Sequence, residues 1–495
     1  MTATLLVPVV APTLAALAAA VLGWRRWVAW AGVAASGVVL AVGVAVAVTT
    51  VDGTVLELAG TLRADALTAV MLLVIGAVSV IASWVGVGYV DRELAAGQTT
   101  PRGARRYQVL VPLFVATMAG AVLASNLGVL WAAVEATTIV TAFLVGHHGG
   151  RRAVEATWKY VIICSVGIAL AYLGTVLVYY ASQHTGGADG RADGGEGSLD
   201  WATLVERAGE LDPGVLRIAV VLLVLGFGTK VGLVPMHSWL PDAHSQAPAP
   251  VSALMSGVLL SVAAYALLRY RVIVAVTLDP AFLRALLLVV GIGSVAVAAS
   301  LLIVQRDYKR LLAYSSIEHM GLVMIGLAVG TRLAIAALLL HVLGHGLAKA
   351  VLFCASGEIL HATGTTQIAG VRGLLARRPA LAGAFGLGTA ALLGLPPFSL
   401  FASELALARA AAGEGLVWVV GVALVLLLVV FVVVARPVAT MLLGAVGPAV
   451  GTAGTATAEA RVVAPLVLGL VALVVIGVVP LDGLLEAAAE IVGSR

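Results

Sequence analysis

The sequence predicts an all-α membrane protein with about fourteen transmembrane helices, two inverted five-helix repeats, and breaks in the seventh and twelfth helices. The first observation is composition. Of 495 residues, 61% are hydrophobic and 11% are charged, with a mean hydropathy of +1.09, which excludes a soluble protein with an ordinary polar surface. The second is that apolar segments of about 18–25 residues recur, each long enough to cross roughly 30 Å of hydrocarbon as a helix. The third is that prolines interrupt two of these segments. The alternating segments typical of a membrane β-barrel are absent, so we expect helices.

The apolar segments define the expected helices in chain order. They are 3–21, 27–49, 67–90, 107–124, 127–146, 157–181, 216–235, 248–270, 282–304, 308–330, 333–358, 379–411, 414–435 and 463–485. No basic region precedes the first segment, and Arg25 and Arg26 follow it, so we expect a retained helix and not a signal peptide. Cys164 and Cys354 fall within apolar segments and indicate neither disulfides nor an iron–sulfur site.

Basic residues are distributed unevenly between the two sets of loops. One side would carry Arg25, Arg26, Arg92, Arg102, Arg105, Arg106, Arg151, Arg152, Arg306, Lys309, Arg310, Arg372, Arg377, Arg378 and Arg436. The other side would carry chiefly Arg269, Arg271, Arg284 and Arg332, as outer-loop residues. Because cytoplasmic loops are enriched in Lys and Arg, we expect a multi-pass protein of the cell inner (plasma) membrane with both termini outside.

Two interrupted segments divide the chain into regions. GFGTKVGLVPMHSWLP lies in the seventh span and LLGLPPFSLFASELALA in the twelfth, five spans later, with expected helix breaks at Pro235, Pro241, Pro396 and Pro397. Matching breaks indicate inverted repeats at 107–270 and 282–436. A three-helix segment, 1–106, would precede them, and a loop and last helix, 437–495, would follow.

Two long loops are expected outside the spans. Loop 182–214 contains the acidic, Gly-rich sequence SQHTGGADGRADGGEGS and should be mobile, and its end, LDWATLVERAGELD, can form a short surface helix. Loop 444–462 is rich in Gly, Ala and Thr and precedes the last span.

Ionisable residues within the apolar spans are the strongest functional signal. Glu135 and Lys230 have apolar residues on both sides, although a charge at mid-bilayer costs about 2.5–3.5 kcal/mol. A carboxylate and an ammonium about 4 Å apart attract by about 4 kcal/mol at an effective dielectric of about 20. Such a pair is balanced closely enough to open when a nearby proton moves. The alternative, a helix-end or purely structural charge, stays open, particularly for Glu358.

The segment HVLGHGLAKAVLF places His341, His345 and Lys349 four residues apart, and therefore on one helix face. Imidazole titrates near neutral pH, so this face is a candidate proton relay. Zinc binding is a weaker alternative because no third ligand stands at a diagnostic spacing, and we predict no metal. Histidines satisfied by their neighbours are a further alternative. Backbone freed at the two breaks is tolerated where it lines a cavity, through which water could reach Lys230 and Glu404.

Four stretches resemble a known family: TKVGLVPMHSWLPDAHSQAPAPVSALMSGVLL, RDYKRLLAYSSIEHMGLVMIG, HVLGHGLAKAVLF and LPPFSLFASEL. The chain from about Asp65 to Arg436 is similar to the antiporter-like proton-translocating subunits of respiratory complex I, multisubunit cation/proton antiporters and energy-converting hydrogenases. SSIEHMG, residues 315–321, is most similar to the F component of hydrogenase-4.

The resemblance implies roles for individual residues. Glu135 would pair with Lys230, and Glu404 would be the terminal charged residue of the path. The histidines and the lysine of the eleventh span would match His341, His345 and Lys349. Glu318 and His319, which also lie within the apolar spans, are further candidates for proton transfer. One departure is Ser261, where complex I relatives tend to carry a lysine, so a water-linked hydroxyl or His319 would have to bridge the gap.

These observations predict a proton-translocating, non-catalytic subunit of a redox-driven complex of the hydrogenase or NADH/quinone oxidoreductase type. GFGTKVG lies inside a span and is not a dinucleotide-binding loop, so we expect no cofactor here. The expected partners are other membrane subunits, a soluble redox module, protons or sodium, and the lipid bilayer, but not nucleic acid. The main alternative is a subunit of a cation/proton antiporter or ion-coupled uptake system without redox chemistry, and a self-contained solute transporter is a weaker one.

Overall fold

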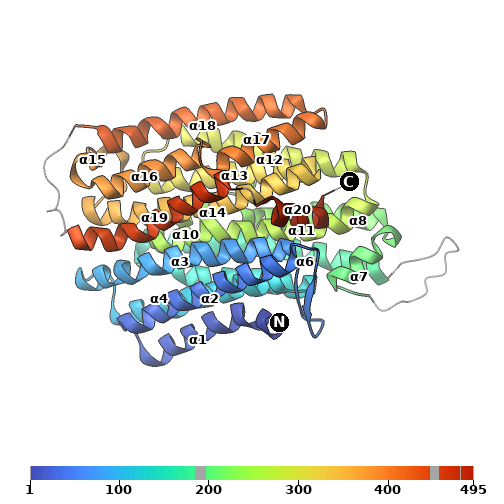
Figure 1. The fold of residues 1–495 in the computed structure, drawn as a ribbon, viewed down its shortest axis with the longest axis horizontal. Helices are drawn as coiled ribbons and strands as arrows, with labels where there is room; N and C mark the ends of the chain where they lie inside the picture. The colour runs from blue at the N-terminus through green and yellow to red at the C-terminus, as the bar shows by residue number, and fades with distance from the viewer. Residues whose placement is uncertain (1, 184–196, 446–455, 480, 494–495) are drawn as a thin grey trace.

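Long helices lie side by side in the computed structural model, which describes residues 2–183, 197–445, 456–479 and 481–493 (Figure 1). The first part of the chain forms α1 (Val7–Leu22), α2 (Arg26–Thr50), α3 (Ala66–Ala95), α4 (Pro101–Leu123), α5 (Leu127–Val145), α6 (Gly150–Gln183), α7 (Trp201–Glu206), α8 (Pro213–Val231), α9 (Trp239–Gln246), α10 (Ala249–Leu254) and α11 (Leu260–Thr277). The second part forms α12 (Pro280–Leu302), α13 (Tyr308–Val329), α14 (Arg332–Thr363), α15 (Leu374–Arg377), α16 (Pro379–Leu392), α17 (Ser399–Gly413), α18 (Val417–Leu443), α19 (Ala456–Val478) and α20 (Asp482–Val492).

Short elements join the long helices. The 3₁₀ turns are η1 (Thr2–Leu6), η2 (Ala208–Glu210) and η4 (Ile368–Gly370), and η3 (Met255–Leu259) is a π-helical turn between α10 and α11. A two-stranded antiparallel hairpin, β1 (Leu56–Leu58) and β2 (Leu62–Ala64), lies between α2 and α3. The sequence reasoning expected neither the hairpin nor the π turn.

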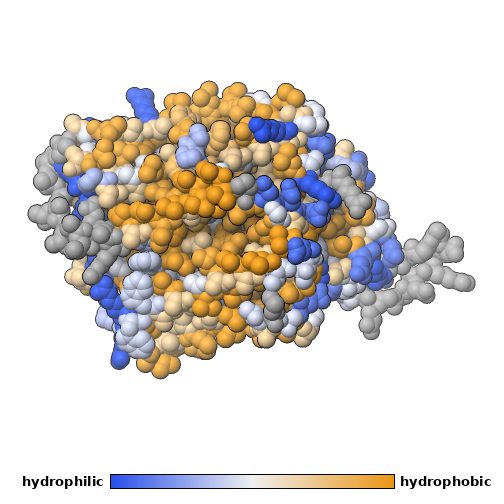
Figure 2. Space-filling view, viewed as in Figure 1, coloured by the Kyte–Doolittle hydropathy of each residue, from blue (hydrophilic) through white to orange (hydrophobic). Residues whose placement is uncertain are grey.

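The predicted class, an all-α multi-pass membrane protein, is confirmed. In the described part of the chain, 12 helices are long and apolar enough to cross a bilayer, and 13 if the bent pair Val462–Val478 and Asp482–Val492 is one span. The expected span 379–411 is two helices, α16 and α17, joined by residues 393–398. Figure 2 shows a broad apolar band across the middle of one face, with most hydrophilic residues near its ends.

Helix boundaries follow local chemistry. Short polar side chains accept hydrogen bonds from backbone N–H groups at the starts of several helices, namely Asp65, Thr100, Asn126, Asp200, Asp212, Asp279, Asp307 and Thr331. Three helices, α8, α13 and α14, end at a glycine in the left-handed conformation. Both kinds of signal are readable in the sequence.

Glycines let neighbouring helices approach closely. A Cβ atom at Gly226 of α8 would lie 2.4 Å from the backbone of Ala171 in α6, and one at Gly167 of α6 would lie 2.5 Å from Thr229. Small residues at such contacts allow tight packing in membranes. This packing fixes the end of α8, which carries Lys230, against α6.

A buried ion pair joins α3 to α11. Arg269 donates from Nη1 to Oδ2 of Asp65 (2.7 Å) and from Nη2 to Oδ1 (2.8 Å), and its Nε donates to the hydroxyl of Tyr265 (2.8 Å). Its guanidinium also lies over the ring of Trp201, 4.6 Å from the centroid. The expectation that Arg269 is an outer-loop residue is therefore wrong. Hydropathy alone would place the Arg269 guanidinium in water, but the buried carboxylate of Asp65 compensates for its charge inside the protein.

The expected loops are described in part. Residues 184–196 of the loop 182–214 lie outside the described residues, and so do residues 446–455 of the loop 444–462. The surface helix expected at the end of the first loop is α7.

Both labelled chain ends lie in the right half of Figure 1, whereas the α1–α2 and α3–α4 links lie on the left.

The break after α8 has a clear local cause. Gly232 ends α8 with φ +86°, and α9 begins at Trp239. Pro235 lies in the break, as expected. Pro241 instead lies in the first turn of α9, where a proline is tolerated because N–H groups there have no acceptor within the helix. Pro396 and Pro397 both lie between α16 and α17.

We expect Gly232→Ala to destabilise the protein more than Gly364→Ala. Both glycines end helices at left-handed angles, with φ +86° and +72°, so each alanine costs about 1–2 kcal/mol of backbone energy. A Cβ atom at Gly232 would also lie 2.3 Å from Cδ1 of Leu240, whereas none of the described atoms lies within 4 Å at Gly364. Overpacking adds about 1–3 kcal/mol. Thermal unfolding midpoints in detergent measure the difference, and equal shifts would contradict it.

Candidate functional site

The ammonium group of Lys230 is held by two hydroxyl groups. Lys230 lies in the last turn of α8 and is 1% exposed. Its Nζ donates to Oγ1 of Thr138 in α5 at 2.6 Å and to the hydroxyl of Tyr160 in α6 at 2.8 Å. The same Nζ lies 4.9 Å from the centroid of the Tyr160 ring. Two hydroxyls and an aromatic face thus replace part of the water that a lysine normally needs.

Thr138 connects Lys230 to Glu135. Its hydroxyl accepts from the lysine and donates to Oε2 of Glu135 at 2.9 Å. The expected pair is therefore bridged by a hydroxyl group, through which a proton can be exchanged between the two. Sequence reasoning missed Thr138, although its position three residues after Glu135 places both on one face of α5. It also missed Tyr160, for which the sequence offered no signal.

Protein covers the break beside Lys230. Nε1 of Trp239 donates to the backbone carbonyl of Thr229 at 2.8 Å, and the backbone N–H of Val234 donates to Oγ of Ser294 at 3.0 Å. The Trp239 ring lies 5.0 Å from the ring of Tyr160. Backbone groups freed by the break are thus satisfied by side chains, which is what a bilayer interior requires.

A second cluster joins α13, α14 and α17. Nδ1 of His319 lies 3.0 Å from Nε2 of His341, and Nδ1 of His341 lies 3.1 Å from Oγ of Ser403. Nε2 of His319 is 3.5 Å from Oε2 of Glu318. The His345 ring lies 5.2 Å from the His319 ring. These contacts form a row of titratable groups on α13 and α14 that ends at a hydroxyl group on α17.

Lys349 extends this cluster along α14. It is fully buried, and its Nζ donates to the backbone carbonyl of Leu312 at 2.8 Å and to Oγ of Ser315 at 2.5 Å. Like His341, it faces α13, as the spacing of four predicts. The expected helix face is therefore turned towards the element that carries Glu318 and His319.

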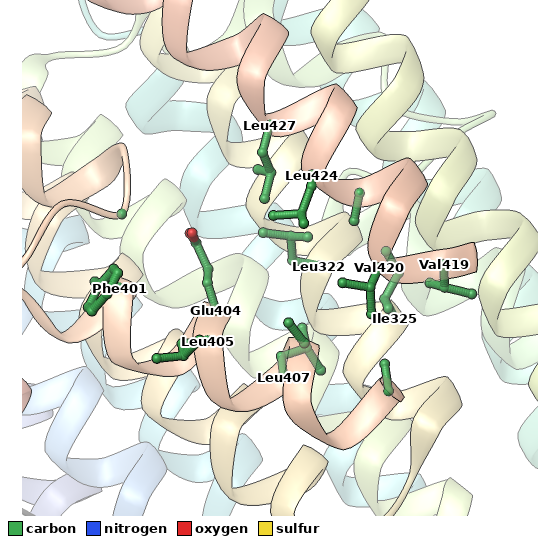
Figure 3. A pocket seen from close by; sticks show the side chains of 14 residues that line it. Leu322, Ile325, Phe401, Glu404, Leu405, Leu407, Val419, Val420, Leu424 and Leu427 are labelled. Atoms are coloured by element: carbon green, nitrogen blue, oxygen red, sulfur yellow. The ribbon is translucent and has the colours of Figure 1, made fainter. Parts of the chain in front are cut away.

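Glu404 ends the row beside the second break. Gly394, with φ +62°, lies in that break, and a Cβ atom there would be 2.4 Å from Oε2 of Glu404. Glu404 also lines a cavity of about 330 Å³ with apolar walls between α13, α17 and α18. Figure 3 shows its carboxyl group among Leu322, Leu405 and Leu424. The carboxyl group is thus the polar group in a mostly apolar recess.

Ligand atoms of His319, His341 and Glu404 all lie within 4.8 Å of one another. The spacing argument against zinc considered one helix at a time and missed ligands that three helices bring together. The same three groups belong to the predicted proton path. The absence of a metal at these three groups stays a prediction.

His244 lies between the two clusters, and sequence reasoning missed it. It is fully buried in α9, its ring stacks on Phe353 of α14 at 5.1 Å, and its charge would interact with Lys309 and Lys349. Ser261, by contrast, donates to its own helix backbone, to the carbonyl of Gly257 at 3.4 Å. The sequence did offer a signal for His244, because a histidine stands only three residues after Pro241, at the end of the broken segment.

Comparison with known proteins places this arrangement in context. The family described as NADH:quinone oxidoreductase/Mrp antiporter, TM, matches residues 124–431. The chain is 39% identical over 318 residues to a hydrogenase-4 component F homolog of Methylacidiphilum infernorum, covering 64% of this chain and 65% of that protein. The chain thus spans slightly less than two thirds of the length of this curated relative.

Two solved structures share the fold. One is the membrane-bound sulfane sulfur reductase, an archaeal respiratory membrane complex, with a TM-score of 0.85 and 24% identity over 100% of this chain and 98% of that chain. The other is the Mrp complex from Dietzia sp. DQ12-45-1b, with a TM-score of 0.84 and 22% identity over 99% and 98%. At these identities the likeness concerns the fold alone.

Proposed function

Because this chain belongs to the NADH:quinone oxidoreductase/Mrp antiporter family, we propose that it translocates protons as a membrane subunit of a redox-driven complex. The chain is an antiporter-like, multi-pass membrane subunit. Beyond this family assignment, we propose that the transported ion is the proton, that a redox reaction drives its movement, and that buried residues of this chain carry it.

The observation that carries the proposal is the distribution of buried titratable groups between the two breaks. Lys230 lies just before the first break, and Glu404 follows the second. Between them lie His244, Lys349, His345, His319 and His341, all 2% exposed or less. Buried ionisable groups are expensive in a membrane protein and typically mark ion pathways.

Coupling between these groups follows from their burial. Charges interact more strongly in a low-dielectric interior than in water, so a proton arriving at one lysine disfavours a proton on the next. Thr138 lets Lys230 and Glu135 exchange a proton without direct contact. The row His319, His341 and Ser403 would deliver it towards Glu404.

The proposed partners follow from the same reasoning. The solved structures of this fold include multisubunit membrane complexes, which supports other membrane subunits as neighbours. We propose a soluble redox module as well, because the buried charges of this chain move protons and do not accept electrons. Sodium in place of protons is a variant of this function.

A cation/proton antiporter subunit without redox chemistry is the second candidate. It is supported by the similarity to the Mrp complex, whose TM-score of 0.84 nearly equals that of the respiratory complex. Sodium-dependent proton movement by the purified complex, without any electron donor, would favour this candidate.

Purification in mild detergent tests the redox assignment. We expect the complex to contain further membrane subunits and a soluble subunit whose flavin or iron–sulfur centres absorb visible light. The chain purified alone should be colourless and lack hydrogenase and quinone reductase activity. Redox turnover by the single chain, or a purified complex without any redox subunit, would contradict the proposal.

The proposed topology has both termini outside the cell, with the Arg-rich links in the cytoplasm. The order of helices supports the proposed repeats at 107–270 and 282–436. In each, three helices (α4 to α6, α12 to α14) precede a broken pair (α8 and α9, α16 and α17), and one long span follows. A repeat of five spans reverses direction in the membrane.

Cysteine labelling in intact cells tests this topology. Both native cysteines are buried, so the introduced thiol dominates the labelling. We expect Ala281→Cys, at the start of α12, to react with an impermeant reagent from outside, and Arg102→Cys, at the start of α4, to react only after the cells are opened. Both positions are exposed, which makes them a matched pair. The reverse result would invert the topology.

A further inference from the structure

A second cluster of ligand-type side chains lies away from the proposed proton path. It contains Glu93 in the last turn of α3 and His147 and His148 in the link between α5 and α6. Nε2 of His148 is 2.5 Å from Oε1 of Glu93, and Nε2 of His147 is 3.4 Å from Oε2. One ligand atom from each of the three lies within 4.8 Å of the other two.

His148 lies between two acceptors. Its Nδ1 is 3.4 Å from the backbone carbonyl of Gln246, and its Nε2 is 2.5 Å from Oε1 of Glu93. In the tautomer that carries its hydrogen on Nδ1, Nε2 presents a lone pair that can bind a metal ion together with the carboxylate of Glu93. A backbone carbonyl on the other ring nitrogen is also the usual way of orienting a metal-binding histidine.

Burial distinguishes this cluster from an ordinary surface group. Glu93 is 1% exposed, and its Oε2 has no hydrogen-bond partner among the described residues. His147 is 7% exposed, and its Nδ1 likewise has no such partner. Both ion-pair contacts of Glu93 are with histidines, since the neighbouring Arg92 pairs with Glu358. His148 is exposed and leaves the cluster open to solvent.

We propose that Glu93, His147 and His148 bind one divalent transition-metal ion, for which Zn²⁺ is the best match. Two imidazoles and one carboxylate suit zinc, whereas Ca²⁺ and Mg²⁺ prefer oxygen ligands alone. A tetrahedral ion about 2.1 Å from each ligand keeps the ligand atoms about 3.4 Å apart. The distance from His147 to Oε2 of Glu93, 3.4 Å, equals that value. The distance from His148 to Oε1 of Glu93, 2.5 Å, is shorter, so the exposed His148 ring would have to rotate away from the carboxylate to admit the ion.

The ion would connect three elements of the bundle. Glu93 belongs to α3, and the two histidines lie in the link between α5 and α6. The third element is α9, because His148 also contacts the backbone carbonyl of Gln246, the last residue of that helix. Helices α5 and α6 carry Thr138 and Tyr160, which hold Lys230. The bound ion would therefore hold α3 against the link between the two helices that contact Lys230. A water molecule would complete the coordination of the ion.

Metal binding to the purified, tag-free full-length chain tests the proposal. We expect the wild type to bind one more Zn²⁺ per chain in equilibrium dialysis than Glu93→Gln/His147→Gln/His148→Ala. Co²⁺ should give visible absorption bands of a low-coordinate site in the wild type alone. The single variant His148→Ala should raise the Kd by about 100-fold or more, because even residues behind the ligands change metal affinity by about 10–100-fold. Unchanged thermal unfolding of the metal-free variants shows that they fold.

Two controls separate this site from the rest of the chain. His237→Ala removes a histidine from the break after α8 and should leave zinc binding unchanged. His341→Ala disrupts the other cluster of potential ligands and should also leave this binding component intact. Equal binding by the wild type and the triple variant would overturn the proposal, and would mean that a proton, not a metal, lies between Glu93 and His148. The proposal would also be overturned if His341→Ala lost the bound zinc ion while His148→Ala kept it.

Discussion

Replacing Lys230 with alanine is expected to reduce proton pumping by the assembled complex about 100-fold or more, the lower end of what a positioned proton-transfer group contributes. The variant removes the cation that Thr138 and Tyr160 hold, and so interrupts the connection to Glu135. Glu135 would then have no link through Thr138 to a cation. Assembly should be largely preserved, because Glu135 is only partly buried and keeps its hydrogen bond from Thr138. Reconstituted complexes with a pH-sensitive dye measure the effect.

Two companion variants make the Lys230 result specific. Lys230→Arg keeps a positive charge that does not release its proton, so it should also impair transfer. Lys159→Ala removes an exposed lysine from α6, whose ion pairs with Glu155 and Asp242 lie at the surface, and should pump normally. Normal pumping by Lys230→Ala in a fully assembled complex would show that Lys230 is only a structural partner.

Replacing His341 with leucine is the change expected to act most strongly in the second half. It removes the contacts with Nδ1 of His319 and Oγ of Ser403, and leaves an apolar side chain in the middle of the row. Proton transfer towards Glu404 should fall about 100-fold or more. Each polar group left unpaired costs about 1–3 kcal/mol, so thermal stability should fall moderately. Proton uptake by inverted membrane vesicles, normalised to assembled complex, measures the transfer.

A matched histidine on the same helix controls for stability. His361 lies near the end of α14 and makes an edge-on ring contact with Tyr89, away from Ser403. His361→Leu should lose some stability but retain near-normal transfer. Ser403→Ala, which removes only one contact of His341, should have an intermediate effect. Equal transfer in His341→Leu and His361→Leu would place His341 outside the path.

The sequence alone determined the membrane class, the positions of the breaks and the identity of most buried charges. These features depend on local chemistry. Helix length follows from the extent of apolar sequence, and helix faces follow from a spacing of four residues, as for His341 and Lys349. The break after Val231 follows from Gly232 and Pro235. Each can be read without knowing which helices are neighbours.

Only the tertiary structure decided which of these groups meet. Thr138 lies between Glu135 and Lys230 because α5, α6 and α8 pack together, and the buried ring of His244 in α9 stacks on Phe353 in α14. Arg269 is buried because Asp65, 204 positions away, pairs with it. Contacts of this kind depend on the close packing of side chains from distant segments, which hydropathy and periodicity do not encode. The sequence therefore contained the titratable groups, and the packing of the helices arranged them into two clusters and a separate Glu-His-His site.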